Sequence, residues 1–410
     1  MATVLPLASL SLPQDQPACR RDGETLLYDC DTWGVSAEWQ VPQSAVSGVY
    51  LARLVRRDGL HNWRQDNSPY GVDARFASFG ETPGEASRPP QPWPHAYGAQ
   101  GHGRMENALK EPQASLVYFV VRDDASRAAM VFQTSDTTWQ AYNLYGGANV
   151  YYGLEPPYRR AYKVSYNRPF QTRATRAVNI LFGAEYPMIR WLESQGYDLT
   201  YQAGIDTDRQ NIASLLDHRV FLSVGHDEYW SGRQRDNVEA ARDQGLSLAF
   251  FSGNEVFWRV RWEDGHRTMV VYKESQELAK KDPMLDEWTG TFRDGRPINP
   301  LGARPENALT GTIFTVNAWR HDALEIPATF SGLRFWRHTA VAELEQGEVR
   351  VIKPGLLGHE WDEDLDNGFR PPGLVRLSRT TVQNLWMVQV FLTTILTLTL
   401  KYRLSTLTPP

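Results

Sequence analysis

The sequence has little of what marks several specialised classes of protein. Cys19 and Cys30 are the only cysteines, so the chain can form neither a disulfide framework nor a four-thiolate zinc site, and we favour a reducing compartment and a cytoplasmic location. No basic run is interleaved with aromatic residues, and 43 Lys and Arg stand against 48 Asp and Glu, for a net charge of -5. We therefore expect no nucleic-acid partner.

Two further absences concern export and membranes. The N-terminus lacks the basic region and the long apolar stretch of a secretory signal, and we interpret residues 1–40 as a disordered leader. The apolar run at 385–400 is 16 residues long and contains Gln389 and four threonines, which falls short of the roughly 20 apolar residues that a spanning helix needs. Its alternating Thr and Leu residues are more typical of a strand, so no membrane span is expected.

The common short enzyme motifs are also missing. The chain contains no G-x-S-x-G elbow, no G-x-x-x-x-G-K-[ST] phosphate loop, no H-E-x-x-H zinc motif and no cysteine in a nucleophile elbow. The acidic run at 358–373, GHEWDEDLDNGFRPPG, lacks the spacing of a calcium loop, and its simplest interpretation is a solvated acidic turn. Any chemistry therefore rests on a less common arrangement of side chains.

The composition itself is that of a globular protein, with 41% hydrophobic and 22% charged residues. We expect one elaborated domain at 41–382, carrying a surface insertion at 58–112 that is dense in Pro, Gly, His and Trp. Strand-like runs at 48–57 and 115–122 flank this insertion and are expected to pair. The Leu- and Thr-rich tail at 383–410 is atypical of such a domain.

The middle of the chain alternates strands and helices. The pattern predicts strands at 129–135, 197–201, 220–224 and 246–251, and helical segments at 185–195, 206–217 and 231–244. Such alternation favours an α/β fold with a mainly parallel sheet flanked by helices, followed by β-rich additions such as a strand-like run at 311–316. In a parallel sheet the loops that follow the strands leave at one edge, so the loops at 136–147, 225–231 and 252–255 should converge.

The most distinctive stretch is VFLSVGHDEYWS, in which an apolar strand ends at a glycine and a helix is expected to begin soon afterwards. His226, Asp227 and Glu228 lie in the turn, at the edge of the sheet where α/β proteins bind ligands. A carboxylate in this position is often only a complement to the helix dipole. Because Tyr229 and Trp230 supply an apolar wall, acid/base chemistry or metal ligation is the alternative for His226 and Glu228.

Two more loops at this edge contribute candidates. Tyr142 and Tyr145 follow the first strand of the alternating region; loop tyrosines usually serve packing, but a phenolate can also ligate ferric iron. Asn254 follows the last strand, where its amide could orient a substrate carbonyl or simply stabilise a turn. The residues alone leave these alternatives open.

Several runs in order along the chain resemble one known family. They are SGVYLARL, FVVRDDASR, TSDTTWQAYNLYGG, SVGHDEYWS, AFFSGNEVFWRVR, DEWTGTFRD, PENALTGTIF and GHEWDEDLDNGFRPPG, between about residues 48 and 373. They resemble the large, or beta, subunit of N,N-dimethylformamidase and the proteins that share its C-terminal domain. The resemblance implies a class I glutamine-amidotransferase-like fold, and an amide hydrolase in which two tyrosines and a glutamate hold one ferric ion.

The resemblance also suggests which residues carry the site. By motif, the metal-binding glutamate falls on Glu228, one tyrosine on Tyr142 in WQAYN, and the second on Tyr50 in SGVY. His226 and Asn254 match positions that line the pocket. Glu360, in the acidic run, matches a further pocket carboxylate.

The function predicted on this basis is metal-dependent hydrolysis of the C–N bond of a small amide, with ferric iron as the expected cofactor. Zinc or manganese stays open, because ligand type only tilts the choice towards a hard ion. A small partner subunit or a homo-oligomer is the expected assembly. Two alternatives are a binding or scaffolding subunit that turns nothing over, and a metal-free hydrolase in which His226 and Glu228 act as acid and base.

Overall fold

The computed structural model describes residues 16–55, 114–154, 156, 158–170, 180–183, 185–384 and 387–392. The predicted insertion at 58–112 lies outside these residues, as does the tail beyond residue 392. Within the described ranges, no helix combines the length and the apolar character that a membrane crossing requires.

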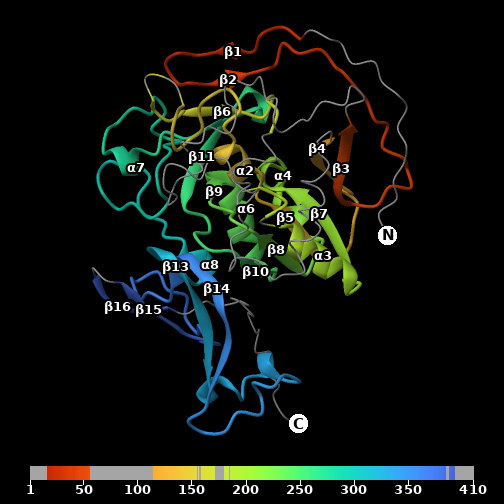
Figure 1. Ribbon diagram of the computed structural model, residues 1–410. Helices are drawn as coiled ribbons and strands as arrows, with labels where there is room; N and C mark the ends of the chain where they lie inside the picture. The colour runs from red at the N-terminus through yellow and green to blue at the C-terminus, as the bar shows by residue number, and fades with distance from the viewer. Residues whose placement is uncertain are drawn as a thin grey trace, which may run out of the picture.

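Four parallel strands form the centre of the molecule (Figure 1). Their order across the sheet is β7-β5-β8-β10, with Met130 of β5 in register with Leu199 of β7 on one side and Val220 of β8 on the other. The strands are β5 (Met130–Thr134), β7 (Leu199–Ala203), β8 (Val220–Val224) and β10 (Ser247–Phe251). The predicted parallel sheet is therefore confirmed, and β8 occupies the residues predicted for it.

Helices cover both faces of this sheet because neighbouring residues of each strand point to opposite sides. On one face, Val131, Phe221 and Leu248 pack with Val238 and Ala241 of a helix. On the other face, the next residue of each strand packs in a second cluster that includes Leu192 of another helix. The helices that follow the strands are α3 (Tyr186–Ser194), α4 (Gly204–Arg209), α5 (Ile212–Leu216) and α6 (Gly232–Asp243).

Helix α6 begins where the sequence indicates. The side chain of Ser231 accepts a hydrogen bond from the backbone N–H of Gln234, and the side chain of Gln234 bonds back to the N–H of Ser231. This reciprocal capping satisfies two backbone donors that the first helical turn leaves without partners.

A second sheet packs beside the first, in the order β6-β12-β11-β9. Its strands are β6 (Lys163–Ser165), β9 (Tyr229–Ser231), β11 (Trp258–Glu263) and β12 (Thr268–Val270). Strand β9 corrects the expectation that Glu228 stands at a helix start. Tyr229 and Trp230 are fully buried and pair in parallel with β11, so a short strand separates Glu228 from α6.

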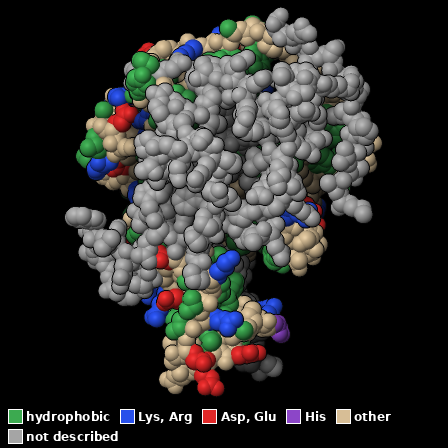
Figure 2. Space-filling model, in the orientation of Figure 1, with side chains coloured by type: hydrophobic (Ala, Val, Ile, Leu, Met, Phe, Trp, Pro, Cys, Tyr) green, Lys and Arg blue, Asp and Glu red, His purple; other side chains and the backbone are tan. Residues whose placement is uncertain are grey.

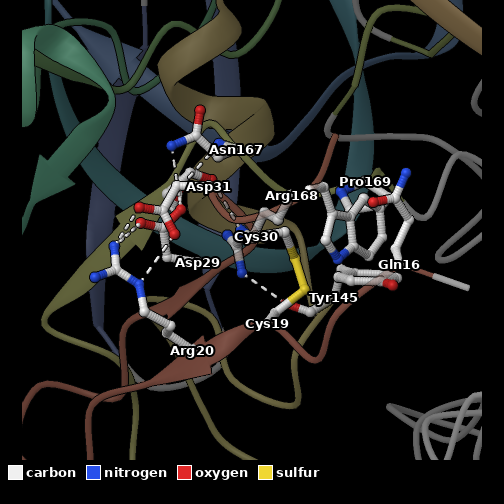
Figure 3. The surroundings of a disulfide bond; sticks show 12 residues. Gln16, Cys19, Arg20, Asp29, Cys30, Asp31, Tyr145, Asn167, Arg168 and Pro169 are labelled. Atoms are coloured by element: carbon white, nitrogen blue, oxygen red, sulfur yellow. Dashed lines mark hydrogen bonds and ion pairs between the residues drawn. A yellow bond between two sulfur atoms is a disulfide. The ribbon is translucent and has the colours of Figure 1, made fainter. Parts of the chain in front are cut away.

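The N-terminal segment runs along the outside of the second sheet (Figure 1). Residues 16–40, part of the predicted leader, contain β1 (Arg20–Arg21) and β2 (Tyr28–Asp29). Cys19 and Cys30 form a disulfide, and Figure 3 shows it beside Arg168 and Tyr145. Disulfides persist mainly in oxidising compartments, whereas the sequence led us to favour a reducing one. The cytoplasmic location stays a prediction.

The remaining elements are mostly hairpins and short helical turns. Strands β3 and β4 pair antiparallel, as predicted, and β13 and β14 form a long arm that extends away from the body, with charged and apolar side chains mixed over its surface (Figures 1 and 2). The bounds are β3 (Gly48–Val55), β4 (Ala114–Val121), β13 (Ile313–Pro327), β14 (Val349–Glu363), β15 (Thr380–Asn384), β16 (Met387–Leu392), α2 (Asp136–Tyr142), α7 (Glu274–Glu277), α8 (Asn307–Thr310), η2 (Asp264–His266), η3 (Ala328–Phe330) and η4 (Arg334–Trp336).

Candidate active site

The candidate site lies where the strand order of the parallel sheet reverses. Chain connections leave β5 and β8 in opposite directions, which in open α/β sheets opens a crevice beyond the strand ends. Helix α2 follows β5 and the His226–Glu228 turn follows β8, and the two meet where the backbone N–H of Glu228 donates to Thr138 Oγ1 at 3.1 Å. The 252–255 loop joins them through a hydrogen bond from Asp227 N–H to Ser252 Oγ. The predicted convergence of these loops is confirmed.

Glu228 is the centre of the site. Only 3% of the residue is exposed, and both of its carboxylate oxygens have hydrogen-bond donors. Trp258 Nε1 donates to Oε1 at 3.0 Å, whereas Tyr151 Oη and Tyr142 Oη donate to Oε2 at 2.7 and 3.3 Å. Three aromatic side chains therefore donate hydrogen bonds to this one carboxylate.

The two tyrosines that contact Glu228 form a stacked pair. Their ring centroids are 4.4 Å apart, and Tyr229 Oη donates to Tyr151 Oη at 2.5 Å. Burial, and next the charge of Glu228, raise the pKa values of Tyr142 and Tyr151 well above 10. Both phenols are therefore neutral hydrogen-bond donors towards Glu228.

Lys273 packs against the aromatic rings of Tyr151 and Trp258 and is only 1% exposed. Its Nζ is 3.5 Å from the centroid of the Tyr151 ring and 4.6 Å from that of Trp258, and no hydrogen-bond partner for it lies among the described residues. Burial lowers the pKa of Lys273 to about 7, while the charge of Glu228 acts in the opposite direction. The aromatic rings thus stand between a buried ammonium and a buried carboxylate.

His226 links Glu228 to the long arm. Its Nε2 is 3.4 Å from Glu228 Oε2 and 3.4 Å from Glu360 Oε2, and Glu360 comes from β14, far away in sequence. Burial raises the pKa of Glu360, an effect that the nearby His226 opposes. The structure therefore brings together four of the predicted residues, Tyr142, His226, Glu228 and Glu360.

Asn254 sits where the 252–255 loop meets β14. Its backbone has a positive φ of 55°, its N–H donates to Asp362 Oδ1 at 2.9 Å, and its buried side-chain Oδ1 has no hydrogen-bond partner among the described residues. The neighbouring Gly253 lies against the backbone carbonyl of Glu360. This loop therefore places Asn254 beside the strand that carries Glu360.

Asp227 points away from Glu228, into the parallel sheet. Its Oδ2 accepts hydrogen bonds from Gln133 Nε2 at 2.7 Å and from Ser223 Oγ at 2.9 Å, and burial raises its pKa to about 8. The same Ser223 Oγ lies 2.6 Å from Glu255 Oε1. Because a hydroxyl carries one proton, one of these two carboxyls must be protonated for both contacts to be hydrogen bonds. Asp227 thus has a structural role.

The structure does not bring Tyr50 to this cluster. Its hydroxyl donates to the backbone carbonyl of Val46 at 2.8 Å, and its ring packs with Trp39 and Phe119 on the β3–β4 hairpin. Strand pairing fixes Tyr50 opposite Phe119, so its side chain follows the hairpin rather than the edge of the parallel sheet.

Tyr151, rather than Tyr50, lies beside Tyr142 and Glu228. A reversal at Gly146 and Gly147, both with φ of 90°, returns the chain so that Val150 N–H bonds to the carbonyl of Ala141. This reversal sets Tyr151 beside Tyr142. The glycine pair followed by ANVYYG was the available signal in the sequence, although Tyr145, with its ring edge on Tyr28, would have fitted that signal equally well.

Comparison with known proteins identifies the family of the chain. A family model described as N,N-dimethylformamidase beta subunit-like, C-terminal, matches residues 5–400. The chain belongs to this family. The match reaches further than the motifs quoted above, from the leader into the Leu- and Thr-rich tail. A search of curated proteins found no match.

The donor atoms of the site suit a hard cation better than a soft one. No group of three or more His, Cys, Asp or Glu side chains in the described part of the chain is arranged to hold a metal ion. Two phenol oxygens and one carboxylate oxygen, however, converge at Tyr142, Tyr151 and Glu228. Oxygen donors of this kind fit ferric iron, which tyrosine ligates in other proteins.

Proposed function

We propose that this protein hydrolyses the C–N bond of a small amide and depends on a metal ion, with iron as the proposed metal. The observation that carries the proposal is the convergence of two tyrosine hydroxyls and one imidazole on a single oxygen of Glu228. The family to which the chain belongs supports amide hydrolysis as the reaction class.

Tyr142, Tyr151 and Glu228 would hold the metal. When bound there, ferric iron would act as a Lewis acid towards the amide carbonyl and lower the pKa of water. The phenols must lose their protons to become ligands, so we expect metal binding to release protons and to weaken as the pH falls.

The surrounding side chains would position the substrate and move protons. His226 lies between two carboxylates, so its imidazole can take a proton at Nε2 and return it to the leaving amine, while Glu360 balances the charge that this creates. The side-chain amide of Asn254 would orient the substrate carbonyl. The rings of Tyr142, Tyr151 and Trp258 surround the carboxylate of Glu228 and would limit its contact with water.

The strand order supports the finer fold class. Order β7-β5-β8-β10 is second, first, third and fourth along the chain, which is the arrangement of doubly wound flavodoxin-like sheets. We propose a class I glutamine-amidotransferase-like domain on this basis. A partner subunit or a homo-oligomer is proposed from the family description, which refers to a beta subunit.

Metal analysis combined with amide-hydrolysis assays tests the function. Purified wild type should contain close to one iron per chain and should hydrolyse small N-alkylated amides, and Glu228→Ala should lose both properties. A wild type that binds no metal and hydrolyses no amide would sink the proposal. A wild type that binds amides without turning them over would favour the binding-subunit alternative instead.

One observation favours a second mechanism on the same site. His226 Nε2 is equally close to Glu228 and Glu360, which is the geometry of an imidazole that exchanges a proton with a carboxylate. Hydrolysis that survives complete removal of metal by a chelator, and that His226→Ala abolishes, would identify this metal-free mechanism.

A further inference from the structure

A second charged site lies behind the candidate active site, on the other face of β11. Adjacent residues of a strand point to opposite faces, so Trp258 points towards Glu228 whereas Arg259 points away from it. The guanidinium of Arg259 makes no hydrogen bond and no ion pair with any described residue. Among the described residues, its one cation–π contact is with Phe292, whose ring centroid lies 5.9 Å from Arg259 Cζ.

This lack of a partner is unusual because Arg259 is half-buried. Burial lowers the pKa of Arg259, and the positive charge of the neighbouring Arg304 lowers it further. Asp236 and Glu287 oppose this lowering from a longer distance. Charged groups that folding withdraws from water are normally paired, yet no carboxylate among the described residues makes an ion pair with the guanidinium of Arg259.

The neighbouring arginines show the contrast. Arg304 Nη2 lies 2.7 Å from Asp236 Oδ1 and 2.8 Å from Glu239 Oε2, and Arg235 Nε lies 2.7 Å from Glu239 Oε1. Arg304 and Arg235 thus share the carboxylates of Asp236 and Glu239. Arg259 forms no ion pair with either of them.

The guanidinium borders a small hollow that is partly open to solvent. Buried aromatic rings form part of its lining, and hydrogen bonds from Asn299 Nδ2 to the carbonyls of Asp294 and Gly302 hold one wall in place. The lining residues are Arg259, Trp288, Thr291, Phe292, Asn299, Leu301, Gly302 and Arg304. Two arginines in a small, partly apolar hollow are well suited to an anion.

The start of α6 adds to the positive potential. Gly232 is the first residue of this helix, and a Cβ atom on it would lie only 2.5 Å from Arg259 Nη2. The glycine thus leaves room for the guanidinium against the positive end of the helix dipole. An anion beside Arg259 would be attracted by the guanidinium, by Arg304 and by the helix.

We propose that this hollow, which we call the Arg259 hollow, binds a small oxyanion, either a carboxylate or a phosphate group, through paired hydrogen bonds from Arg259. The planar guanidinium matches both groups in a bidentate arrangement. The site is distinct from the Glu228 cluster and requires neither the proposed metal nor the proposed hydrolysis.

Calorimetric titration with inorganic phosphate and, separately, with acetate tests the proposal, in chloride buffers of matched ionic strength. We expect wild type to bind one of these ions at one site per chain, and we expect Arg259→Gln to bind it at least tenfold more weakly. Arg267→Gln is the control, because Arg267 is exposed on the turn after β11. It should bind as wild type does.

Two further measurements test the proposed anion binding at Arg259. Arg259→Lys keeps the charge but loses the fork of donors, so weakened binding in this variant would support the bidentate arrangement even if the Gln variant failed to fold. Binding of phosphate alone would indicate a phosphate group, and binding of acetate alone a carboxylate. No binding of either ion to wild type, or equal binding to Arg259→Gln, would overturn the proposal.

Discussion

The two faces of β11 differ in the groups that surround the charged side chain on each. On the face of Trp258, the carboxylate of Glu228 receives hydrogen bonds from three aromatic side chains and has Lys273 nearby. On the other face, Arg259 has the ring of Phe292 and the guanidinium of Arg304 nearby, and Asp236 and Glu287 act on it from beyond ion-pair distance. One face therefore pairs its buried charge within the fold, whereas no described residue makes an ion pair with Arg259. This difference is the basis for the ligand proposed at Arg259.

The largest expected effect comes from replacing Glu228, on the Trp258 face of β11. Glu228→Gln keeps the shape of the side chain but replaces Oε2 or Oε1 with an amide nitrogen, which cannot accept from the tyrosines or from Trp258. We expect amide hydrolysis to fall on the order of 1,000-fold, the upper range for loss of one electrostatic group in a site. Steady-state kinetics and metal content measure this. Glu277→Gln, which alters an ion pair outside the site, should leave both unchanged.

A buried carboxyl outside the site extends the comparison to pH. Glu185 Oε1 accepts from Ser135 and Trp139, but its Oε2 has no hydrogen-bond partner among the described residues. Burial raises its pKa from 4.5 to about 7. The folded state therefore holds a proton that the unfolded state releases between these values, so this group's contribution to stability falls as pH rises through that window.

Glu185→Gln should remove this loss of stability at higher pH. The free energy of unfolding of wild type should fall by up to roughly 3 kcal/mol more than that of the variant between pH 4.5 and pH 8. Urea unfolding across this pH range measures the difference. Parallel curves for the two proteins would contradict the assignment of a proton to Glu185.

Trp258 tests whether the hydrogen bonds to Glu228 matter for the proposed metal. Trp258→Phe removes the donor to Oε1 while it keeps an aromatic ring in β11. We expect metal affinity to fall about 10- to 100-fold, as for other partners that orient a ligand. Trp262→Phe is a matched control on the same strand, because its Nε1 has no hydrogen-bond partner within the described part of the chain. Competition with a chelator of known affinity provides the measurement.

The smallest effect is expected on the other face of β11, at Arg259. Without an added anion, Arg259→Gln should raise the free energy of unfolding by about 1 kcal/mol, because it removes a half-buried charge that lacks a partner. Arg261→Gln should do the reverse, because Arg261 is buried and bonds to both oxygens of Asp282. Denaturant unfolding in chloride buffer compares the two. A loss of stability of similar size in both variants would remove the distinction between them.

Sequence patterns predicted the parallel sheet because its signals are local. Each strand is a short apolar run, and the capping pair Ser231 and Gln234 defines where α6 begins. The position of Glu228 and His226 after β8 followed from the same patterns. The sequence did not reveal β9, because a strand of three residues is defined by its pairing with β11 rather than by its own periodicity.

The sequence by itself determined the order of strands and helices in the parallel sheet, the edge at which its loops meet and the residue type at the centre of the site. Each of these depends on neighbours along the chain. Tertiary structure decided which tyrosines reach Glu228, where the Gly146–Gly147 reversal selects Tyr151 and strand pairing holds Tyr50 elsewhere. It also decided that Lys273 is buried near the carboxylate of Glu228, while Arg259 makes no ion pair with a described residue. Compensation of charge depends on contacts between distant segments, and no local pattern encodes it.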